Sequence, residues 1–197
     1  MTLTALGKNA ALGGVTAVIT HLGLLQAGTP LTAVTGATST DLFTKTAHGL
    51  TAGDLIVVSA QTGGTGIIAG RPYFVIATGL TANVFAVALT PGGTAVDLGT
   101  DVSTCTVTEY TEISGGSPAY ARVTNSWNTA ADGSIDNNVV GADVNVPAAA
   151  TVNAIGGYSA LTTGNLHDLA IVTAEGPYGA QGLYQITDYD VNINAAA

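Results

Sequence analysis

The sequence contains very few charged side chains. Lys and Arg number 4 and Asp and Glu 13 among 197 residues, so charged residues make up only 9% of the chain and the formal net charge is −9. A typical soluble domain has about a quarter charged residues, and this charge keeps separate copies apart in solution. This composition predicts an exterior rich in Thr, Ser, Asn, Ala and Gly, typical of a protein that packs against copies of itself or a larger assembly.

The scarcity of cations excludes two classes of partner. The four cations, Lys8, Lys45, Arg71 and Arg122, are scattered along the chain, whereas nucleic acids and anionic membrane surfaces are bound by clustered Lys and Arg. The longest apolar runs, such as residues 73–77, are far shorter than a bilayer span, and the first residues do not form a convincing signal peptide. We therefore expect no nucleic-acid partner and no membrane partner.

Cysteine and histidine are also scarce. Cys105 is the single cysteine, so no intrachain disulfide can form. His21, His48 and His167 do not have the spacing of metal ligands. His167 and Asp168 are adjacent in a predicted strand, where neighbouring side chains point to opposite faces and cannot converge on one ion without a bulge. We expect no metal site and no cofactor.

One set of residues could in principle form a hydrolytic site. Ser59, His48 and Asp54 supply a nucleophile, a base and an orienting carboxylate. However, His48 belongs to the segment HGLTAGD, whose glycines favour a turn, and Asp54 is expected to cap that turn before the next strand. We therefore expect a protein that is not an enzyme.

The segment NTAADGSIDNN, residues 128–138, loosely resembles a calcium loop through Asp132 and Asp136. The EF-hand pattern also needs an oxygen ligand at its third position and a glutamate at its twelfth. Ala130 and Val139 occupy those positions here. The segment therefore predicts a polar hairpin loop, with weak incidental calcium binding as a minor alternative.

Local patterns predict an all-β chain preceded by one short helix. Residues 2–12 favour a helix capped by Thr2 or Thr4 and ended by Gly13 and Gly14. After a strand at residues 15–25, turn signals follow about every ten residues, which is typical of a small β-barrel. The strands predicted for this barrel are residues 31–38, 42–46, 54–60, 73–78, 83–89, 94–98 and 104–110. Two of them, 73–78 and 83–89, are apolar on both faces and should form the buried centre.

The last part of the chain is predicted to form a second β-module. Its predicted strands are residues 119–127, 139–146, 151–162, 166–174 and 182–193. In the final strand Tyr184 and Ile186 share one alternation phase, whereas Tyr189 and Val191 share the other. This change of phase predicts a bulge near residues 187–188.

The aromatic residues allow two interpretations. Trp127 with nearby tyrosines could form a sugar-binding platform or the rim of a protein interface, since both use aromatic side chains with polar tips. Packing within a β-domain is the ordinary alternative for most of them. The tyrosines considered are Tyr110, Tyr120, Tyr158, Tyr178, Tyr184 and Tyr189.

Several segments resemble a family of small virion proteins of tailed bacteriophages, chiefly those of actinobacteria, often labelled phage tail fibre or minor structural proteins. The segments are KNAALGG at 8–14, GGSPAYAR at 115–122 followed by Trp127, VPAAATV at 146–152 and YGAQGLYQIT at 178–187. The resemblance covers residues 1–29 and 112–197. In shorter members the first strand runs almost directly into GGSPAYAR, so the intervening residues are interpreted as an insertion.

The domain prediction follows from this resemblance. Residues 1–29 and 111–197 are expected to form a discontinuous, β-sandwich-like base domain that includes the short helix. Residues 30–110 are expected to form an inserted small β-barrel. The resemblance implies no catalytic residues, but it implies a structural or interface motif. The motif residues are Gly115, Gly116, Pro118, Tyr120, Arg122, Trp127, Tyr178, Gln181 and Tyr184.

The expected function is that of a non-enzymatic virion protein, made in the cytoplasm of a bacterial host. The chain lacks the coiled-coil heptads and β-helix repeats expected of a fibre shaft, which favours a capsid decoration protein on the outer capsid surface. Its expected partners are two further copies in a homotrimer and the major capsid protein. A tail fibre, minor tail or baseplate protein bound to tail proteins is the alternative, and a carbohydrate-binding adhesin is a further one.

Overall fold

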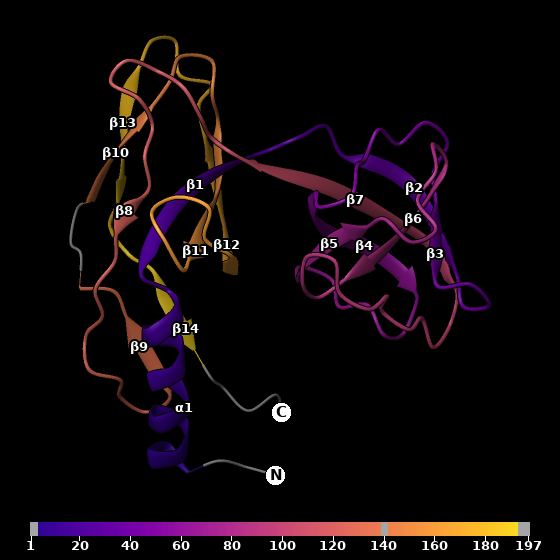
Figure 1. The fold of residues 1–197 in the computed structure, drawn as a ribbon, viewed down its shortest axis with the longest axis horizontal. Helices are drawn as coiled ribbons and strands as arrows, with labels where there is room; N and C mark the ends of the chain where they lie inside the picture. The colour runs from indigo at the N-terminus through magenta and orange to yellow at the C-terminus, as the bar shows by residue number, and fades with distance from the viewer. Residues whose placement is uncertain (1–3, 139–141, 193–197) are drawn as a thin grey trace. The chain divides into compact units, whose positions relative to one another are not determined.

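The computed structural model describes residues 4–138 and 142–192, and it confirms an all-β fold with one short helix (Figure 1). The chain divides into two compact units. The base unit contains the chain up to Gln26 together with the chain from Glu112 onward, and the barrel unit is Ala27–Thr111. These divisions lie close to those expected at residues 29/30 and 110/111.

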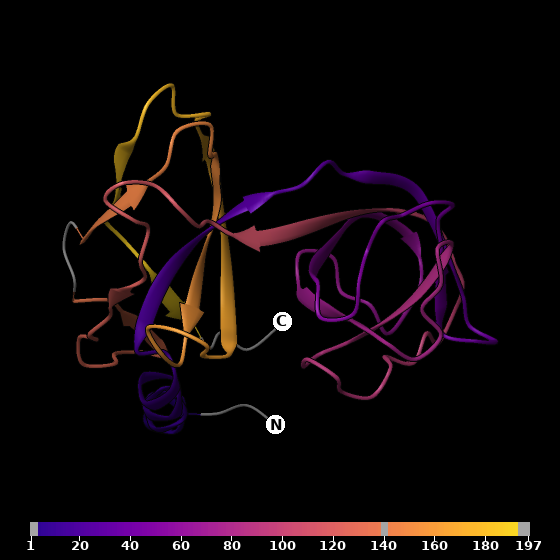
Figure 2. The same ribbon diagram turned by 45° about the horizontal axis from the view of Figure 1, so that its top comes forward.

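The barrel unit is a closed β-barrel of six antiparallel strands (Figure 2). Its strands are β2 (Leu31–Ala37), β3 (Leu42–Thr44), β4 (Leu55–Gly63), β5 (Pro72–Ile76), β6 (Val84–Ala88) and β7 (Val102–Glu112). The strand order is β7-β2-β3-β6-β5-β4, and β4 pairs with β7 to close the ring. The expected inserted barrel is therefore present.

Strands β5 and β6 are buried on both faces, as their apolar sequences predicted. Inside the barrel, Tyr73 and Phe85 belong to the main core, where Phe85 stacks on Phe43 with ring centroids 5.4 Å apart. On the other face, Ile76 and Ala86 form a smaller cluster. The two clusters explain why these strands show no alternation of apolar and polar residues.

The strand predicted at residues 94–98 is wrong. This segment is a loop that packs Ala95 against the outer face of β6. The Val96 N–H donates to the carbonyl of Val87 at 2.8 Å, and the Leu98 N–H donates to Asp41 Oδ1 at 2.9 Å. The Asp41 side chain thus accepts a hydrogen bond from the Leu98 N–H. In a β-strand this N–H would donate to the backbone of a neighbouring strand.

The base unit is sandwich-like. Its elements are α1 (Ala5–Val18), β1 (His21–Ala27), β8 (Val123–Thr124), β9 (Ser134–Asp136), β10 (Ala142–Val146), β11 (Val152–Tyr158), β12 (Leu166–Glu175), β13 (Gly182–Ile186) and β14 (Asp190–Asn192). β11 pairs with both β12 and β1, and β8 also pairs with β1. The β10–β13 pair packs on this sheet through a shared core that includes Leu22, Val144, Ile155 and Ile186.

The helix is longer than predicted. Thr4 caps it, as expected, by accepting a hydrogen bond from the Gly7 N–H at 3.2 Å, and the alternative cap Thr2 lies outside the described residues. The helix continues through the predicted stop at residues 13–14 to Val18, so the first part of the strand predicted at 15–25 is wrong. Burial of Leu12 and Ile19 explains the extension, since tertiary packing outweighs the low helix propensity of two glycines.

The long strand predicted at residues 119–127 is also wrong. Only the two residues of β8 are in strand conformation there. The preceding chain turns at Gly115 and Gly116, which have φ of +86° and +90°, and the Tyr120 N–H donates back to the carbonyl of Gly115 at 2.7 Å. These backbone groups are therefore used within a turn instead of a ladder.

The end of the chain forms two strands where one bulged strand was predicted. β13 pairs with β10, placing Tyr184 opposite Val144, whereas β14 pairs with β9, placing Val191 opposite Ile135. The change of alternation phase therefore marks a change of partner. The first residues of the strand predicted at 139–146 and the last of that predicted at 182–193 lie outside the described residues.

Residues 128–138 form the predicted hairpin. Asn128 N–H donates to the carbonyl of Asp136 at 3.0 Å, and Ala131 and Ser134 exchange two backbone hydrogen bonds. Asp132 and Gly133 both have positive φ, as a tight two-residue hairpin turn requires. β9 is the second strand of this hairpin.

Candidate functional site

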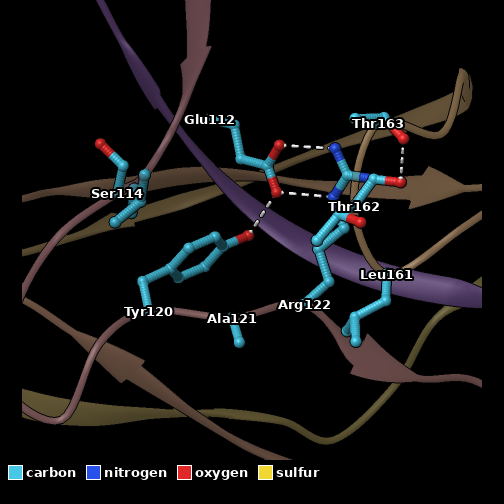
Figure 3. Close-up of a pocket in the computed structure, with 9 residues that line it drawn as sticks. Glu112, Ser114, Tyr120, Ala121, Arg122, Leu161, Thr162 and Thr163 are labelled. Carbon is cyan, nitrogen blue, oxygen red and sulfur yellow. Dashed lines mark hydrogen bonds and ion pairs between the residues drawn. The ribbon is translucent and has the colours of Figure 1, made fainter.

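The base unit contains a cleft of about 450 Å³ (Figure 3), within the range of volumes of small-ligand sites. The residues lining it come from the end of β7, the GGSPAYAR segment and the turn between β11 and β12. They are Glu112, Ile113, Ser114, Tyr120, Ala121, Arg122, Leu161, Thr162 and Thr163. Two predicted motif residues, Tyr120 and Arg122, therefore lie at this cleft.

An ion pair between Glu112 and Arg122 forms one wall of the cleft. Arg122 Nε donates to Glu112 Oε1 and Arg122 Nη2 donates to Glu112 Oε2, each at 2.7 Å. The Arg122 side chain is only 9% exposed, whereas that of Glu112 is 28% exposed. The two-pronged geometry aligns the guanidinium plane with the carboxylate, which is the strongest arrangement of these two groups.

Two tyrosines hold this ion pair in place. The Tyr120 hydroxyl donates to Glu112 Oε1 at 2.9 Å (Figure 3). The same hydroxyl accepts from the Leu24 N–H at 2.9 Å. The guanidinium carbon of Arg122 lies 3.5 Å from the ring centroid of Tyr158, and Nη1 donates to the carbonyl of Ala160 at 2.7 Å. Because β1, β7 and β11 all contribute to these contacts, the network connects segments that are far apart in the sequence.

The electrostatics of the network keep the protons on its two tyrosines and its arginine. Burial, together with the nearby Glu112 carboxylate, raises the pKa of Tyr120, and the same two causes raise the pKa of Tyr158. The hydrogen bonds that Arg122 donates to Glu112 raise the pKa of Arg122. At neutral pH both tyrosines are therefore protonated and the arginine is charged, so none of the three is poised to exchange a proton.

A second group of motif residues meets at Gln181. Gln181 Oε1 accepts from the Ser117 N–H and Nε2 donates to the carbonyl of Pro118, both at 2.6 Å. A β-carbon on Gly116 would lie 3.0 Å from Gln181 Oε1, so this turn has little space for a side chain. The GGSPAYAR and YGAQGLYQIT segments are thus joined by a side chain that caps the turn.

The other motif residues lie away from the cleft. Tyr178 exchanges backbone hydrogen bonds with residues 149–150, and its hydroxyl donates to Glu175. Tyr184 lies on β13 and packs against the core.

Trp127 is tied into the base unit and lies outside the cleft. Its indole N–H donates to the carbonyl of Ile19 at 2.9 Å, and its ring lies 6.0 Å from that of Tyr189. Tyr110 belongs to the barrel unit, where it pairs with Leu55. Tyr120 is the member of the proposed aromatic set that lines the cleft.

The residues considered for a hydrolytic site have structural partners. His48 is buried, with Nδ1 accepting from the Leu50 N–H at 3.0 Å and Nε2 lying 3.3 Å from the carbonyl of Val84. The Asp54 carboxylate accepts from both the N–H and the hydroxyl of Thr51, so it caps the turn as expected. Ser59 is exposed on β4, and both ring nitrogens of His48 face backbone groups.

His167 and Asp168 have different surroundings. A bulge is present, because Gly157 pairs with Asp168 while Tyr158 pairs with Leu166, which leaves His167 as the extra residue. Asp168 nevertheless accepts a hydrogen bond from the Tyr189 hydroxyl at 2.7 Å. His167 is exposed.

Three carboxylates gather where β9 and β14 pair. Oxygen atoms of Asp136, Asp188 and Asp190 all lie within 4.8 Å of one another. Partial burial and the other two carboxylates raise the pKa of Asp190. Among the described residues this is the group that could meet a cation, but all three are exposed, and exposed acidic groups commonly lie together without one. The sequence pattern identified Asp136 but missed the other two, because strand pairing brings them together.

Sequence reasoning missed most of the cleft. Glu112 and the turn at residues 161–163 were not predicted as site residues, and Tyr158 was considered only as one member of the aromatic set. One signal was available: Glu112 and Arg122 flank the GGSPAY segment in a chain that has only 4 cations. Opposite charges on either side of a turn segment indicate a contact, although they do not identify Tyr158 as the residue that stacks on the guanidinium.

No family model, curated protein or solved structure matches this chain. Among the described residues, no helix is both long and apolar enough to cross a membrane.

Proposed function

We propose that this protein is a non-enzymatic structural component of a tailed-bacteriophage virion, and specifically a decoration protein on the outer capsid surface. The segments that resemble phage virion proteins all belong to the base unit. Gln181 joins two of them through hydrogen bonds to the 117–118 turn, and Trp127 bonds to the carbonyl that follows the helix. These contacts support the resemblance, since segments that resemble one family are expected to pack together.

The observation that carries the proposal is an exterior that combines little charge with exposed apolar side chains. Only 9% of residues are charged. The large apolar side chains between 39% and 58% exposed are Val18, Leu161, Ile171 and Leu183 in the base unit and Ile68 and Leu89 in the barrel unit. A surface of this kind suits permanent burial against neighbouring copies, since apolar area removed from water stabilises the assembly.

The proposed assembly is a homotrimer bound to the major capsid protein. The base unit contains the motif residues and provides the contacts with neighbouring copies, while the barrel unit is a second module with its own core. The enzyme alternative is disfavoured because the ionisable side chains at the cleft, Glu112, Arg122 and Tyr120, are bound to one another.

Light scattering of the purified protein and imaging of intact particles test this proposal. We expect a mass three times that of the 19.4 kDa chain and extra density over the capsid lattice. We also expect capsids lacking the protein to break at lower temperature. A stable monomer found only at the tail tip would contradict the proposal.

The tail alternative makes a different prediction. A fibre, minor tail or baseplate subunit would bind host cells as a purified protein, and its deletion would abolish infection while leaving capsid stability unchanged. The uncharged exterior fits either location, so the effect of deletion on the capsid is the measurement that separates the two.

A further inference from the structure

We propose that the cleft of Figure 3 is a binding site for a neutral saccharide. This inference does not depend on the virion proposal, because it rests on the chemistry of the cleft alone. It also differs from the platform suggested by the sequence, since Trp127 lies outside this cleft.

The charges at the cleft favour a neutral ligand. Glu112 and Arg122 are the two charged residues that line it, and their charges cancel in a two-pronged ion pair. An anionic ligand would have to compete with Glu112 for the guanidinium, against a net charge of −9 for the whole chain. A cationic ligand would have to compete with Arg122 in the same way.

The same ion pair presents hydrogen-bonding groups side by side. Of the five N–H donors of a guanidinium, three are used in the bonds to Glu112 and Ala160. Glu112 Oε2 accepts one of these bonds, which leaves a lone pair on that oxygen. A donor adjacent to an acceptor matches two neighbouring hydroxyls of a sugar, one accepting from Arg122 and one donating to Glu112.

The cleft also offers apolar surface to the C–H face of a sugar ring. Leu161 is 50% exposed at the cleft, and Tyr120 lines it as well. The hydroxyls of Thr162 and Thr163 lie on the same turn as Leu161. Small-ligand sites generally combine such apolar lining with a few polar groups that orient the ligand.

The network makes these groups rigid before a ligand arrives. Tyr120 holds Glu112, and Tyr158 together with the Ala160 carbonyl holds Arg122. Side chains that are already fixed lose little conformational entropy on binding. A single sugar buries little surface, so we expect dissociation constants of about 1 mM for monosaccharides, equivalent to about −4 kcal/mol.

An NMR titration of the ¹⁵N-labelled full chain tests the proposal. The probes are the methyl glycosides of glucose, galactose, mannose and N-acetylglucosamine, each added to several times the expected dissociation constant. We expect at least one to cause saturable amide shifts in residues 112–114, 120–122 and 161–163. The variant Leu161→Asp should bind it at least about tenfold more weakly.

Leu183→Asp is the matched control. It places the same charge at another exposed leucine of the base unit, 58% exposed and outside the cleft, and should bind like the unaltered chain. Absence of saturable shifts with all four glycosides would overturn the proposal, as would shifts outside the cleft or equal binding by Leu161→Asp. Saturation of the same residues by inorganic phosphate would overturn the assignment of a neutral ligand. The oligomeric state and the position on a particle do not enter this test, so its failure would leave the virion proposal standing.

Discussion

At the residue scale, the Glu112–Arg122 pair is the most constrained contact of the base unit. Removing the Arg122 guanidinium from water is costly, and the gain depends on complete pairing. The structure provides that pairing through Glu112, the carbonyl of Ala160 and the ring of Tyr158. Loss of any one partner should therefore cost more than an average surface substitution.

We expect Arg122→Met to lower the free energy of unfolding of the base unit by about 3 kcal/mol, since it leaves Glu112 and the Ala160 carbonyl without their partner. Urea unfolding followed by Trp127 fluorescence measures this change. His167→Met is the matched control, because His167 is exposed in the base unit that Trp127 reports on and should change stability by less than about 0.5 kcal/mol. Equal effects of the two substitutions would show that the ion pair contributes little.

At the element scale, the helix shows how tertiary packing outweighs local signals. Gly13 and Gly14 are good stop signals in isolation, yet both lie inside α1. A β-carbon added at either position would have no heavy atom within 4 Å. Neither glycine is therefore required by a contact within this chain, and both weaken the helix by enlarging the conformational freedom of the unfolded state.

We expect Gly13→Ala to raise the stability of the base unit by about 0.5–1 kcal/mol, measured as a higher unfolding midpoint in urea. For contrast, Gly156→Ala on β11 should destabilise it, because a β-carbon there would lie 2.7 Å from both Leu166 Cδ1 and Tyr158 Cε2. A destabilising effect of Gly13→Ala accompanied by dissociation of the proposed trimer would show that another copy contacts this face of the helix.

Strand pairing is the other feature of this scale that local pattern did not predict. The apolar alternation of residues 182–193 located both segments and the switch between them. It did not show that β13 and β14 pair with β10 and β9 respectively. The alternation of apolar and polar residues shows which side of a strand is buried. The strand with which it pairs is determined by contacts between residues that are distant in the sequence.

At the scale of the whole molecule, the two units have separate cores and each contains a natural reporter. Trp127 is the single tryptophan and belongs to the base unit, while Cys105 is the single cysteine and belongs to the barrel unit. Burial raises the pKa of Cys105 to about 11. The native thiol is therefore protonated and shielded at pH 8, and a thiol reagent should label it only when the barrel opens.

We expect Gly66→Ala to move thiol labelling to lower urea concentrations while the Trp127 transition changes much less. Gly66 has a φ of +97°, and a β-carbon there would lie 2.0 Å from the Asp97 carbonyl oxygen. The barrel unit should lose about 2–4 kcal/mol. Gly92→Ala is the control that tests backbone strain without a steric clash. Gly92 has a φ of +66°, and a β-carbon added there would have no heavy atom within 4 Å. Equal shifts of both reporters in Gly66→Ala would show that the units unfold as one.

Features that depend on neighbouring residues could be predicted from the sequence. Alternation and turn signals predicted an all-β chain, most barrel strands, the Thr4 cap, the 128–138 hairpin and the turn capped by Asp54. These follow from the side-chain chemistry and backbone preferences of a few consecutive residues. Tyr120 and Arg122 were expected in a motif only through the resemblance to phage virion proteins, which did not indicate what they contact.

The cleft, in contrast, depends on contacts between segments that are distant in the sequence. Glu112, Arg122 and Tyr158 come from different strands and segments, and the turn at 161–163 closes the site from the far end of β11. Long-range packing likewise closes the barrel and extends the helix past its two glycines. It also divides the last predicted strand between two partner strands. The physical reason is that burial and pairing are shared between segments distant in the sequence, so no single segment contains the information.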